Sequence, residues 1–579
     1  MSPVGTACEC KHCSKQSQRN ITSQIASRGI VVAPPAVRKK STTSPSPTPS
    51  SSQPRQASIS VPSTSRRRSP EPKKQKRRRL APRSPSPAPI PTLDFCNVQK
   101  CIPNASRIIL ESRPQIPDLE KDVRAVNIDS TLDEISKRRF RPGELVWCDI
   151  EKPIRPKPKE TNVEIRFWPG LVEECNFKAD VTANTKGQYV YSVKFLALPQ
   201  RVPFQSDRLL PYQAHAPPQA IVERMSNLSP DELSYQRETL YHLAIITNVG
   251  PGRPSFNQTL PIFAVALEIA RDVRELWTLT DEFNLQFTVP RLIKNADSIS
   301  AVASEQRQTI NQPHFLGLWW GPERIWVGDL VRLKLSRRSF APEGIPGAVL
   351  PPSGPGPGAL EEISEHRDDV DMGEMGAQTR GLFMHIKRLF VTEKVSTDGT
   401  LMRECRVAGK IYELADADWK EEDVAMVSKD DEDAADYVPL PQAPKGYNFR
   451  GILASDYECI CAISVLSGRY YPRILFHPLL ADKVQEIVSA AVDSQSLVEF
   501  GHLVCLEGLE EGIKNAVEPT RYKLSRPAIL QEADRTAVAR MEKFADSLRQ
   551  AQKDDEFEEE EEAESAERTA VDVDELFSE

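Results

Sequence analysis

Apolar and polar residues alternate in many short stretches of this chain, a pattern that predicts β-strands. The most distinct stretch runs from Phe315 to Leu335 and contains three of the seven tryptophans. From Ile325 onward its apolar positions repeat every second residue, and the pair Gly328-Asp329 interrupts them. We expect a strand with a bend at this pair, in which Gly328 has a positive φ and Asp329 caps a backbone turn.

The same alternation continues beyond this stretch. It predicts further strands at residues 381–391, 406–414, 447–453, 459–463 and 468–473. Together with the bent strand, they predict a small β-barrel over residues 311–480. Proline, glycine and acidic residues are abundant in residues 336–379, so we expect this part to be a disordered insertion.

An earlier group of short strands predicts a second barrel over residues 100–215. Its markers follow one another along the chain: Pro142-Gly143 before a strand, then Trp168-Pro169, the apolar run 193–196 and a closing Pro211-Tyr212. Short strands separated by such turns are typical of a five-stranded barrel.

Helical spacing is found between and after the barrels. Residues 216–310 are predicted to be a helical connector, with one helix over 261–277 and Thr-Asp-Glu at 280–282 as the cap of another. Residues 481–552 are predicted to form C-terminal helices, the last of them amphipathic over 528–552. The predicted fold class is therefore mainly β with a helical connector: two small β-barrel modules plus long disordered termini.

Both ends of the chain are strongly charged, and the 579 residues include 48 prolines. Residues 1–95 form a Ser/Pro-rich arm, whose first 90 residues hold 18 Lys or Arg but only two acids. Residues 553–579 are acidic, with 14 Asp or Glu against one Arg from residue 554 onward. Such compositions bury too little apolar surface to offset chain entropy, so both ends are expected to be disordered.

Two basic clusters in the arm predict a nuclear localisation signal, and hence a nuclear protein. Their residues are Arg66, Arg67, Arg68, Lys73, Lys74, Lys76, Arg77, Arg78 and Arg79. The alternative is a solvated charge run that contacts nucleic acid nonspecifically, and the two interpretations are compatible. Because the whole chain has a net charge of -7, the part between the charged ends is mildly acidic, and any nucleic-acid affinity belongs to the arm.

The eleven cysteines are scattered, and several lie beside strand-like apolar residues, as reduced core thiols do. Cys8, Cys10, His12 and Cys13 offer four soft ligands close together. Structural zinc usually binds two separated pairs of ligands, so we expect no metal there or elsewhere.

The sequence contains no catalytic motif that we recognise, so the protein is expected not to be an enzyme and to need no cofactor. Cys459 or Cys461 with His477 could serve as nucleophile and base, but both cysteines flank Ile460 as residues of a buried strand would. No apolar run approaches the length of a membrane span, so no membrane partner is expected.

Two stretches resemble known chromatin modules. Val327 to Leu333 resembles the entry strand of a BAH domain, and Gly317 to Trp326 resembles the C-terminal region of the fungal cryptic loci regulator family of transcription-silencing proteins. Residues 140–213, with their ordered markers, resemble a PWWP domain of the Tudor-like group.

The PWWP resemblance implies a methyl-lysine cage with walls at Ile150, Trp168 and Phe195, since a quaternary ammonium prefers aromatic faces. Ile150 is not aromatic, and the alternative is that all three are barrel core. Tyr470 and Tyr471 are candidates for a peptide-contacting surface, with half-buried packing as the alternative.

The family resemblance implies a non-enzymatic chromatin adaptor or reader in heterochromatic transcriptional gene silencing. Its implied partners are histones or nucleosomes and the subunits of a silencing complex that contains a histone deacetylase and a remodelling ATPase. The alternative function is a DNA- or RNA-binding transcription regulator that acts through the basic arm.

Overall fold

The computed structural model describes twelve segments of the chain. They are residues 96–101, 107–110, 112–117, 139–156, 163–178, 188–228, 255–290, 307–366, 375–395, 401–420, 440–489 and 494–576. The basic arm, with all of the residues assigned to the localisation signal, lies outside the described residues.

A five-stranded antiparallel sheet forms where the second barrel was predicted. Its strands are β3 (Leu145–Ile154), β4 (Ile165–Lys178), β5 (Gln188–Phe195), β6 (Arg201–Gln205) and β7 (Leu209–Pro211). They lie in the order β6-β5-β4-β3-β7. Leu145 to Cys148 at the start of β3 are all buried, so this strand is covered on both faces. We call this unit the small sheet.

A twelve-stranded sheet forms the other β unit, which we call the large sheet. Its main path runs β1-β15-β13-β12-β9-β8-β17, with β2, β10, β11, β14 and β16 attached beside it. The strands before the insertion are β1 (Cys96–Lys100), β2 (Arg107–Ile109), β8 (Leu276–Pro290), β9 (Arg307–Trp320), β10 (Glu323–Trp326) and β11 (Leu330–Ser336). Those after it are β12 (Gly381–Val395), β13 (Leu401–Asp416), β14 (Tyr447–Gly451), β15 (Tyr457–Ala462), β16 (Leu466–Arg469) and β17 (Arg521–Tyr522).

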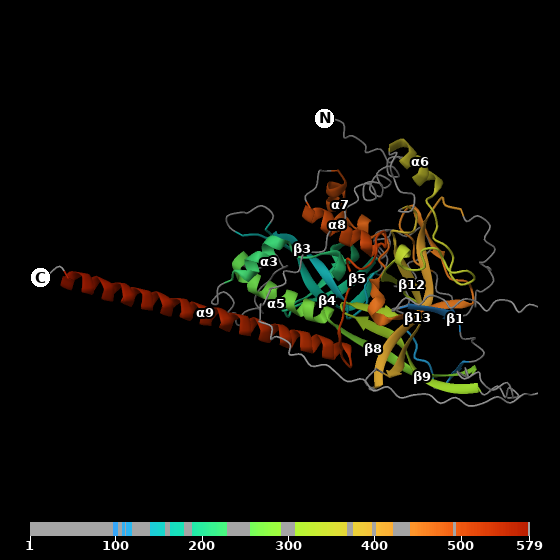
Figure 1. The fold of residues 1–579 in the computed structure, drawn as a ribbon, viewed down its shortest axis with the longest axis horizontal. Helices are drawn as coiled ribbons and strands as arrows, with labels where there is room; N and C mark the ends of the chain where they lie inside the picture. Colours follow the sequence, from blue (N-terminus) through green and yellow to red (C-terminus); the bar gives the residue numbers. More distant parts are fainter. Residues whose placement is uncertain are drawn as a thin grey trace, which may run out of the picture. The chain divides into compact units, whose positions relative to one another are not determined.

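The mainly β class is confirmed, as are the five strands expected after residue 380. The large sheet nevertheless extends well beyond residues 311–480. β8 pairs with β9 along most of its length, and β1 pairs with β15, so strands from distant parts of the sequence enter one sheet (Figure 1). Hydrophobic alternation finds such strands one by one, but it does not say which of them are neighbours.

The bend expected at Gly328 is present. Gly328 has φ of 93°, and the N–H of Asp329 donates to the carbonyl of Trp326 at 3.0 Å. The side chain of Asp329 accepts a hydrogen bond from the N–H of Trp326 at 2.7 Å, which is the expected cap. The turn separates β10 from β11, and a glycine with positive φ at its third position is the requirement of a type II turn.

The described part of the predicted helical connector contains strand as well as helix. α3 (Gln219–Ser226) and α5 (Phe256–Arg274) confirm helices there, and Ser255 with Gln258 forms a capping box at the start of α5. The prediction that residues 280–282 cap a further helix was wrong, because they lie inside β8. Asp281 instead pairs with Arg324 at 3.0 Å.

The insertion at residues 336–379 was expected to be disordered, and its described part is folded. Arg337 at its start is fully buried and pairs with Glu413 of β13 at 2.7 Å. Val349 bridges to Leu453, and Leu350 is buried. Further along lies α6 (Pro357–His366). Proline and glycine content predicted a loop, but apolar residues and one buried ion pair fasten that loop to the large sheet.

Among the described residues, three further helices lie beyond β16: α7 (Pro478–Ser489) and α8 (Ser494–Leu506) before β17, and α9 (Arg526–Leu576) after it. α9 contains the predicted amphipathic helix and continues through the acidic run that was assigned to a disordered tail (Figure 1). Glutamate has a high helix propensity, which is consistent with this continuation. None of the helices in the described residues is both long and apolar enough to cross a membrane.

Candidate functional site

A cavity of about 990 Å³ lies beside the small sheet, and we call it the groove. Its walls come from β3 and β4, from the segment after β7, and from helices α3, α5, α7, α8 and α9. The apolar residues that line it include Trp147, Phe167, Tyr212, Ile221, Met225, Phe263, Leu267, Leu480, Leu503, Met541 and Phe544. This size is at the upper end of the range for ligand-binding pockets.

The floor of the groove is aromatic. Trp147 and Tyr212 stack with ring centroids 5.6 Å apart, and the ring of His215 lies edge-on to Trp147 at 4.9 Å. Burial, together with the positive charges of Lys483 and Arg166, lowers the pKa of His215 to about 3. His215 is therefore neutral at physiological pH, so the floor behaves as an apolar surface.

Charged residues surround this floor. The cations that line the groove are Arg166, Arg271, Arg274, Lys483, Lys514 and Arg540, and the acids are Glu164, Glu268 and Asp482. Acids outside the lining pair with some of these cations, since Asp272 lies 2.9 Å from Arg540 and Glu510 contacts Lys514. These pairs offset much of the positive excess of charge around the floor.

The two sheets are joined by a buried polar network, which we call the joint. Arg141, just before β3, makes a two-pronged ion pair with Asp329, at 2.7 and 2.9 Å. Both side chains are almost fully buried, at 1% and 5% exposed. In the opposite direction, Glu144 accepts the N–H of Arg324 at 2.9 Å and pairs with Arg469 at 3.3 Å.

A second group extends the joint. Glu323 accepts the N–H of Arg469 and the hydroxyl of Tyr471, at 2.7 and 2.9 Å. Arg332 donates to the carbonyl of Arg469 and contacts Gln213, which follows the small sheet. Desolvation raises the pKa of Glu323, although Arg469 and Arg332 oppose the shift. Each charge in this dry region has an opposite charge or a backbone partner, as buried charges require.

The predicted cage residues are core residues in this structure. Ile150, Trp168 and Phe195 are 2%, 0% and 0% exposed. The rings of Trp168 and Phe195 lie 6.3 Å apart, but Phe263 of α5 packs on Trp168 at 5.1 Å. The indole N–H of Trp168 donates to the carbonyl of Leu196. A methylammonium group could reach these faces only if α5 moved away.

The two candidate surface tyrosines are buried, each at 6% exposed. The hydroxyl of Tyr470 donates to the carbonyl of Gln442 at 2.8 Å, and its ring packs edge-on against Phe383 and Phe449. The idea of a peptide-contacting surface at these residues was therefore wrong. The alternative of half-buried packing is closer, but both rings are buried more deeply than that.

The thiols and the imidazole considered for catalysis have different hydrogen-bond partners. Cys459 and Cys461 are fully buried and lie 3.5 Å apart, sulfur to sulfur. His477 instead shares a hydrogen bond with the carbonyl of Ser206 at 3.2 Å. The cluster of Cys8, Cys10, His12 and Cys13 lies outside the described residues.

The sequence pointed to both ends of the joint but not to the contact. Arg141 and Glu144 flank Pro142-Gly143, a marker of the barrel predicted over residues 100–215, and Asp329 belongs to the bent strand. No local signal pairs residues 188 positions apart, as Arg141 and Asp329 are. Nothing in the sequence indicated the groove, because the residues that line it come from eight separate segments of the chain.

The described residues form a mainly β scaffold with a large cavity, lined by apolar and charged side chains, beside the small sheet. Residues 314–472, from within β9 to just after β16, match a family model described as transcription-silencing protein Clr2. No curated protein matches this chain significantly. This part of the large sheet is thus similar to the Clr2 transcription-silencing proteins.

A solved structure described as "Structure of Clr2 bound to the Clr1 C-terminus" is also similar to this chain. The likeness has 14% sequence identity and a TM-score of 0.28, and it covers 68% of this chain. The chain spans 58% of the length of that solved chain.

Proposed function

We propose that this protein is a non-enzymatic, nuclear subunit of a transcription-silencing assembly, and that the groove holds a segment of a partner subunit. The observation that carries the proposal is the family match over residues 314–472, which covers the centre of the large sheet. Gly328 and Asp329, in the turn just before β11, lie inside the matched part.

The groove supports a binding role. Its floor is aromatic and neutral, and apolar side chains from α3, α5 and α9 rise around it. An amphipathic segment bound in such a groove would bury its apolar face. Burial of apolar surface is the dominant favourable contribution to the free energy of association. We propose that the occupant is a segment of a partner subunit. It would be comparable to the Clr1 C-terminus, which is bound to Clr2 in the solved structure.

The finer assignments follow from the resemblances of the sequence and are proposals too. The large sheet would correspond to a BAH-like module and the small sheet to a PWWP-like module. The assembly would contain a histone deacetylase and a remodelling ATPase and act on heterochromatin. Direct reading of methylated histones receives less support, because Trp168 and Phe195 have no exposed face.

The groove can be tested with two phenylalanines on one helix. Phe544 of α9 lines the groove, whereas Phe557 lies further along α9, outside the lining. Both side chains are exposed, at 37% and 63%. We expect Phe544→Asp to lose the partners that co-purify with the full chain from nuclear extract, identified by mass spectrometry. Phe557→Asp is the matched control and should keep them.

The alternative is a DNA- or RNA-binding regulator that acts through the basic arm, residues 1–95. Deleting residues 1–90 distinguishes the two functions. The adaptor keeps its partner subunits after the deletion, once a heterologous import signal replaces the lost one. If the deletion abolishes silencing while Phe544→Asp leaves both silencing and the partners intact, the nucleic-acid binder is the better account.

A further inference from the structure

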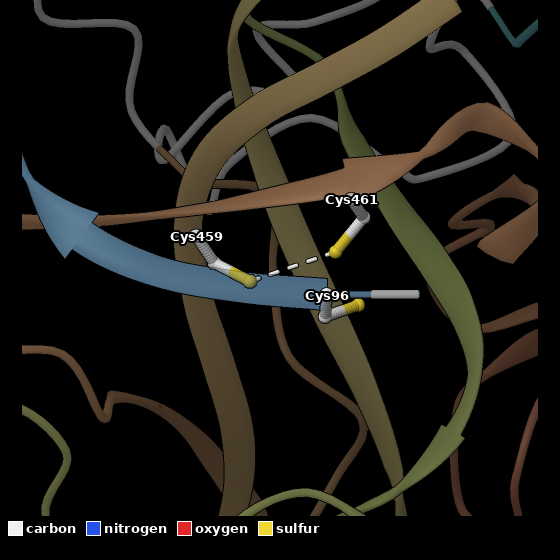
Figure 2. Close-up of side chains that lie close together, drawn as sticks. All are labelled: Cys96, Cys459 and Cys461. Atoms are coloured by element: carbon white, nitrogen blue, oxygen red, sulfur yellow. Dashed lines mark hydrogen bonds between the residues drawn. The ribbon is translucent and has the colours of Figure 1, made fainter. Parts of the chain in front are cut away.

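Three cysteines converge in the core of the large sheet. Cys96 of β1 and Cys459 and Cys461 of β15 are 5%, 0% and 0% exposed. Their sulfur atoms all lie within 4.8 Å of one another. Figure 2 shows the three side chains pointing into one space between the two neighbouring strands. Cys405 is also buried in this core but is not part of the group.

The pairing of the strands explains the convergence. Cys96 lies directly opposite Cys461 in the antiparallel ladder, and Val98 lies opposite Cys459. Cys459 and Cys461 are two residues apart on one strand, so their side chains share a face of the sheet. β1 ends the main path of the sheet and pairs with β15. The cluster therefore spans the contact that holds this edge strand.

The spacing of the sulfur atoms fits a metal ion. The sulfurs of Cys459 and Cys461 are 3.5 Å apart, and no pair in the cluster exceeds 4.8 Å. A triangle with sides in this range places its corners roughly 2.0–2.8 Å from its centre, which brackets a Zn–S bond length of about 2.3 Å. No large rearrangement is needed to bring three sulfurs onto one ion.

Metal binding also suits the chemistry of these side chains. Thiolate is the ligand form of cysteine, and a bound cation stabilises it, because thiolate ligands are deprotonated by the metal they bind.

We propose that Cys96, Cys459 and Cys461 bind one thiophilic divalent ion of the Zn²⁺ class. Soft thiolates select such ions over Mg²⁺ or Ca²⁺. A divalent ion leaves less uncompensated charge in this dry core than a monovalent one would, and buried charge is costly. Three protein sulfurs leave the fourth tetrahedral position to a small ligand such as water. The ion fastens β1 to β15.

Two other states of the cluster compete with this proposal. The three thiols could remain protonated and act as small apolar core residues, which is common for buried cysteine. Alternatively, Cys96 and Cys461 could form a disulfide across the strands, with an external oxidant taking up the two electrons and two protons. Neither state binds a metal ion, so metal content separates both of them from the proposal.

The test measures metal in the full chain, purified under reducing conditions without a metal-affinity tag. We expect about one zinc per chain by elemental analysis. After removal of the metal, titration with Cd²⁺ should produce thiolate-to-metal charge-transfer absorption that saturates at the same stoichiometry. Chelation of the metal should lower the thermal midpoint, since binding energy of a structural ion is also folding energy.

Cysteine variants locate the site. Cys96→Ala changes the edge strand and should abolish stoichiometric binding and the Cd²⁺ absorption band. Cys405→Ala is the matched control, since Cys405 is buried in the same core, and it should retain both. A triple Ala variant of Cys8, Cys10 and Cys13 tests the other soft cluster in the chain, and it should also retain both. If Cys96→Ala does not fold, Cys459→Ala and Cys461→Ala repeat the measurement.

Several outcomes would overturn the proposal. One is a reduced full chain that neither contains zinc nor takes up Zn²⁺ or Cd²⁺. A second is a mass decrease that reports a disulfide in place of a metal. A third is binding that survives Cys96→Ala but disappears in the Cys8, Cys10 and Cys13 variant. None of these outcomes bears on partner binding in the groove, so the two proposals fail independently.

Discussion

The same kind of turn precedes β3 in the small sheet and β11 in the large sheet. In the small sheet, Gly143 has φ of 88° and the N–H of Glu144 donates to the carbonyl of Arg141 at 3.1 Å. The turn before β11 repeats this geometry at Gly328 and Asp329. In both turns the acidic side chain accepts the N–H of the residue three positions earlier. A short turn of this kind needs glycine and favours a capping acid.

The two turns differ in the further hydrogen bonds that their carboxylate oxygens accept. Glu144 is longer and reaches the backbone N–H of Arg324 in the other sheet. Asp329 is shorter and stays within its own turn, so Arg141 comes across to it. Each turn therefore completes the other, and neither sheet keeps its buried charges paired without its partner. We expect the two sheets to unfold together rather than as separate domains.

The strongest way to break this reciprocity is to remove Asp329. In Asp329→Ala the guanidinium of Arg141 stays buried but loses the carboxylate with which it pairs. The N–H of Trp326 also loses its hydrogen-bond acceptor. Removing one partner of a buried ion pair costs about 3–5 kcal/mol. The free energy of unfolding, measured by urea titration with tryptophan fluorescence, should fall by this amount.

A double variant controls for the charge. Arg141→Met combined with Asp329→Leu removes both charges and keeps similar volume, so it should recover much of the loss. A loss of less than about 1 kcal/mol in Asp329→Ala is what an exposed pair would give, and it would contradict the role assigned to the joint. Two separate unfolding transitions in the unmodified chain would also contradict it.

The glycines of the two turns allow a direct comparison. Gly143→Val and Gly328→Val each place a β-branched residue at positive φ, which costs on the order of 1–3 kcal/mol. A Cβ at Gly143 would also meet the indole of Trp319 at 2.5 Å. Gly143→Val should therefore lower the thermal midpoint more than Gly328→Val does.

Binding adds a second readout to this pair. If Gly328 starts the organising strand of the large sheet, Gly328→Val should weaken partner association together with stability in the full chain. Unchanged melting and unchanged co-precipitation in this variant would mean that the turn does not organise the sheet. Equal decreases of the thermal midpoint in the two variants would show that Trp319 moves aside with little loss of stability.

Local pattern was enough to predict the turn at Gly328, the helix at α5 and most strands after residue 380. Each depends on the residue types of one short segment, such as the helical spacing of apolar residues over 261–277. The same reasoning failed at residues 280–282, where Thr, Asp and Glu favour a helix cap. Pairing with β9 and the ion pair with Arg324 hold this segment in β8 instead.

Long-range contacts account for the remaining differences. The cage residues were placed correctly on the small sheet, but nothing near Trp168 in the sequence announces that Phe263 covers it. Composition predicted disorder for residues 336–379, yet Arg337 at the start of that part is buried against Glu413. Tertiary burial of one or two groups is enough to override the preference of a proline- and glycine-rich segment.

Acid should weaken both regions through buried histidines. Burial lowers the pKa of His215, beside the small sheet, to about 3, and that of His477, after the large sheet, to about 4. Between these values and the unfolded pKa of about 6.5, the unfolded chain binds protons that the folded chain does not. Stability is therefore complete above about pH 6.5 and falls as the pH decreases, by about 1.4 kcal/mol per pH unit for each histidine.

Variants of the two histidines show how much each contributes to the pH dependence of stability. His215→Phe should remove one histidine's share of the pH dependence, and His477→Gln the other. The measurement is the urea unfolding free energy between about pH 5 and about pH 7. If the sheets unfold together, one unfolding transition shows the pH dependence of both histidines. If they unfold as independent domains, each transition shows the pH dependence of one histidine.

The smallest expected effect comes from an ion pair at the edge of the small sheet. Arg155 and Glu164 lie 2.5 Å apart, as close as the partners in the joint, but their side chains are 44% and 29% exposed. Water and salt screen such a pair, so Arg155→Gln should cost between about 0 and 1 kcal/mol. Moderate salt should reduce even this effect, while leaving the loss in Asp329→Ala nearly unchanged. A salt-sensitive loss at both sites would mean that the joint is wet, and that charge rather than burial determines its strength.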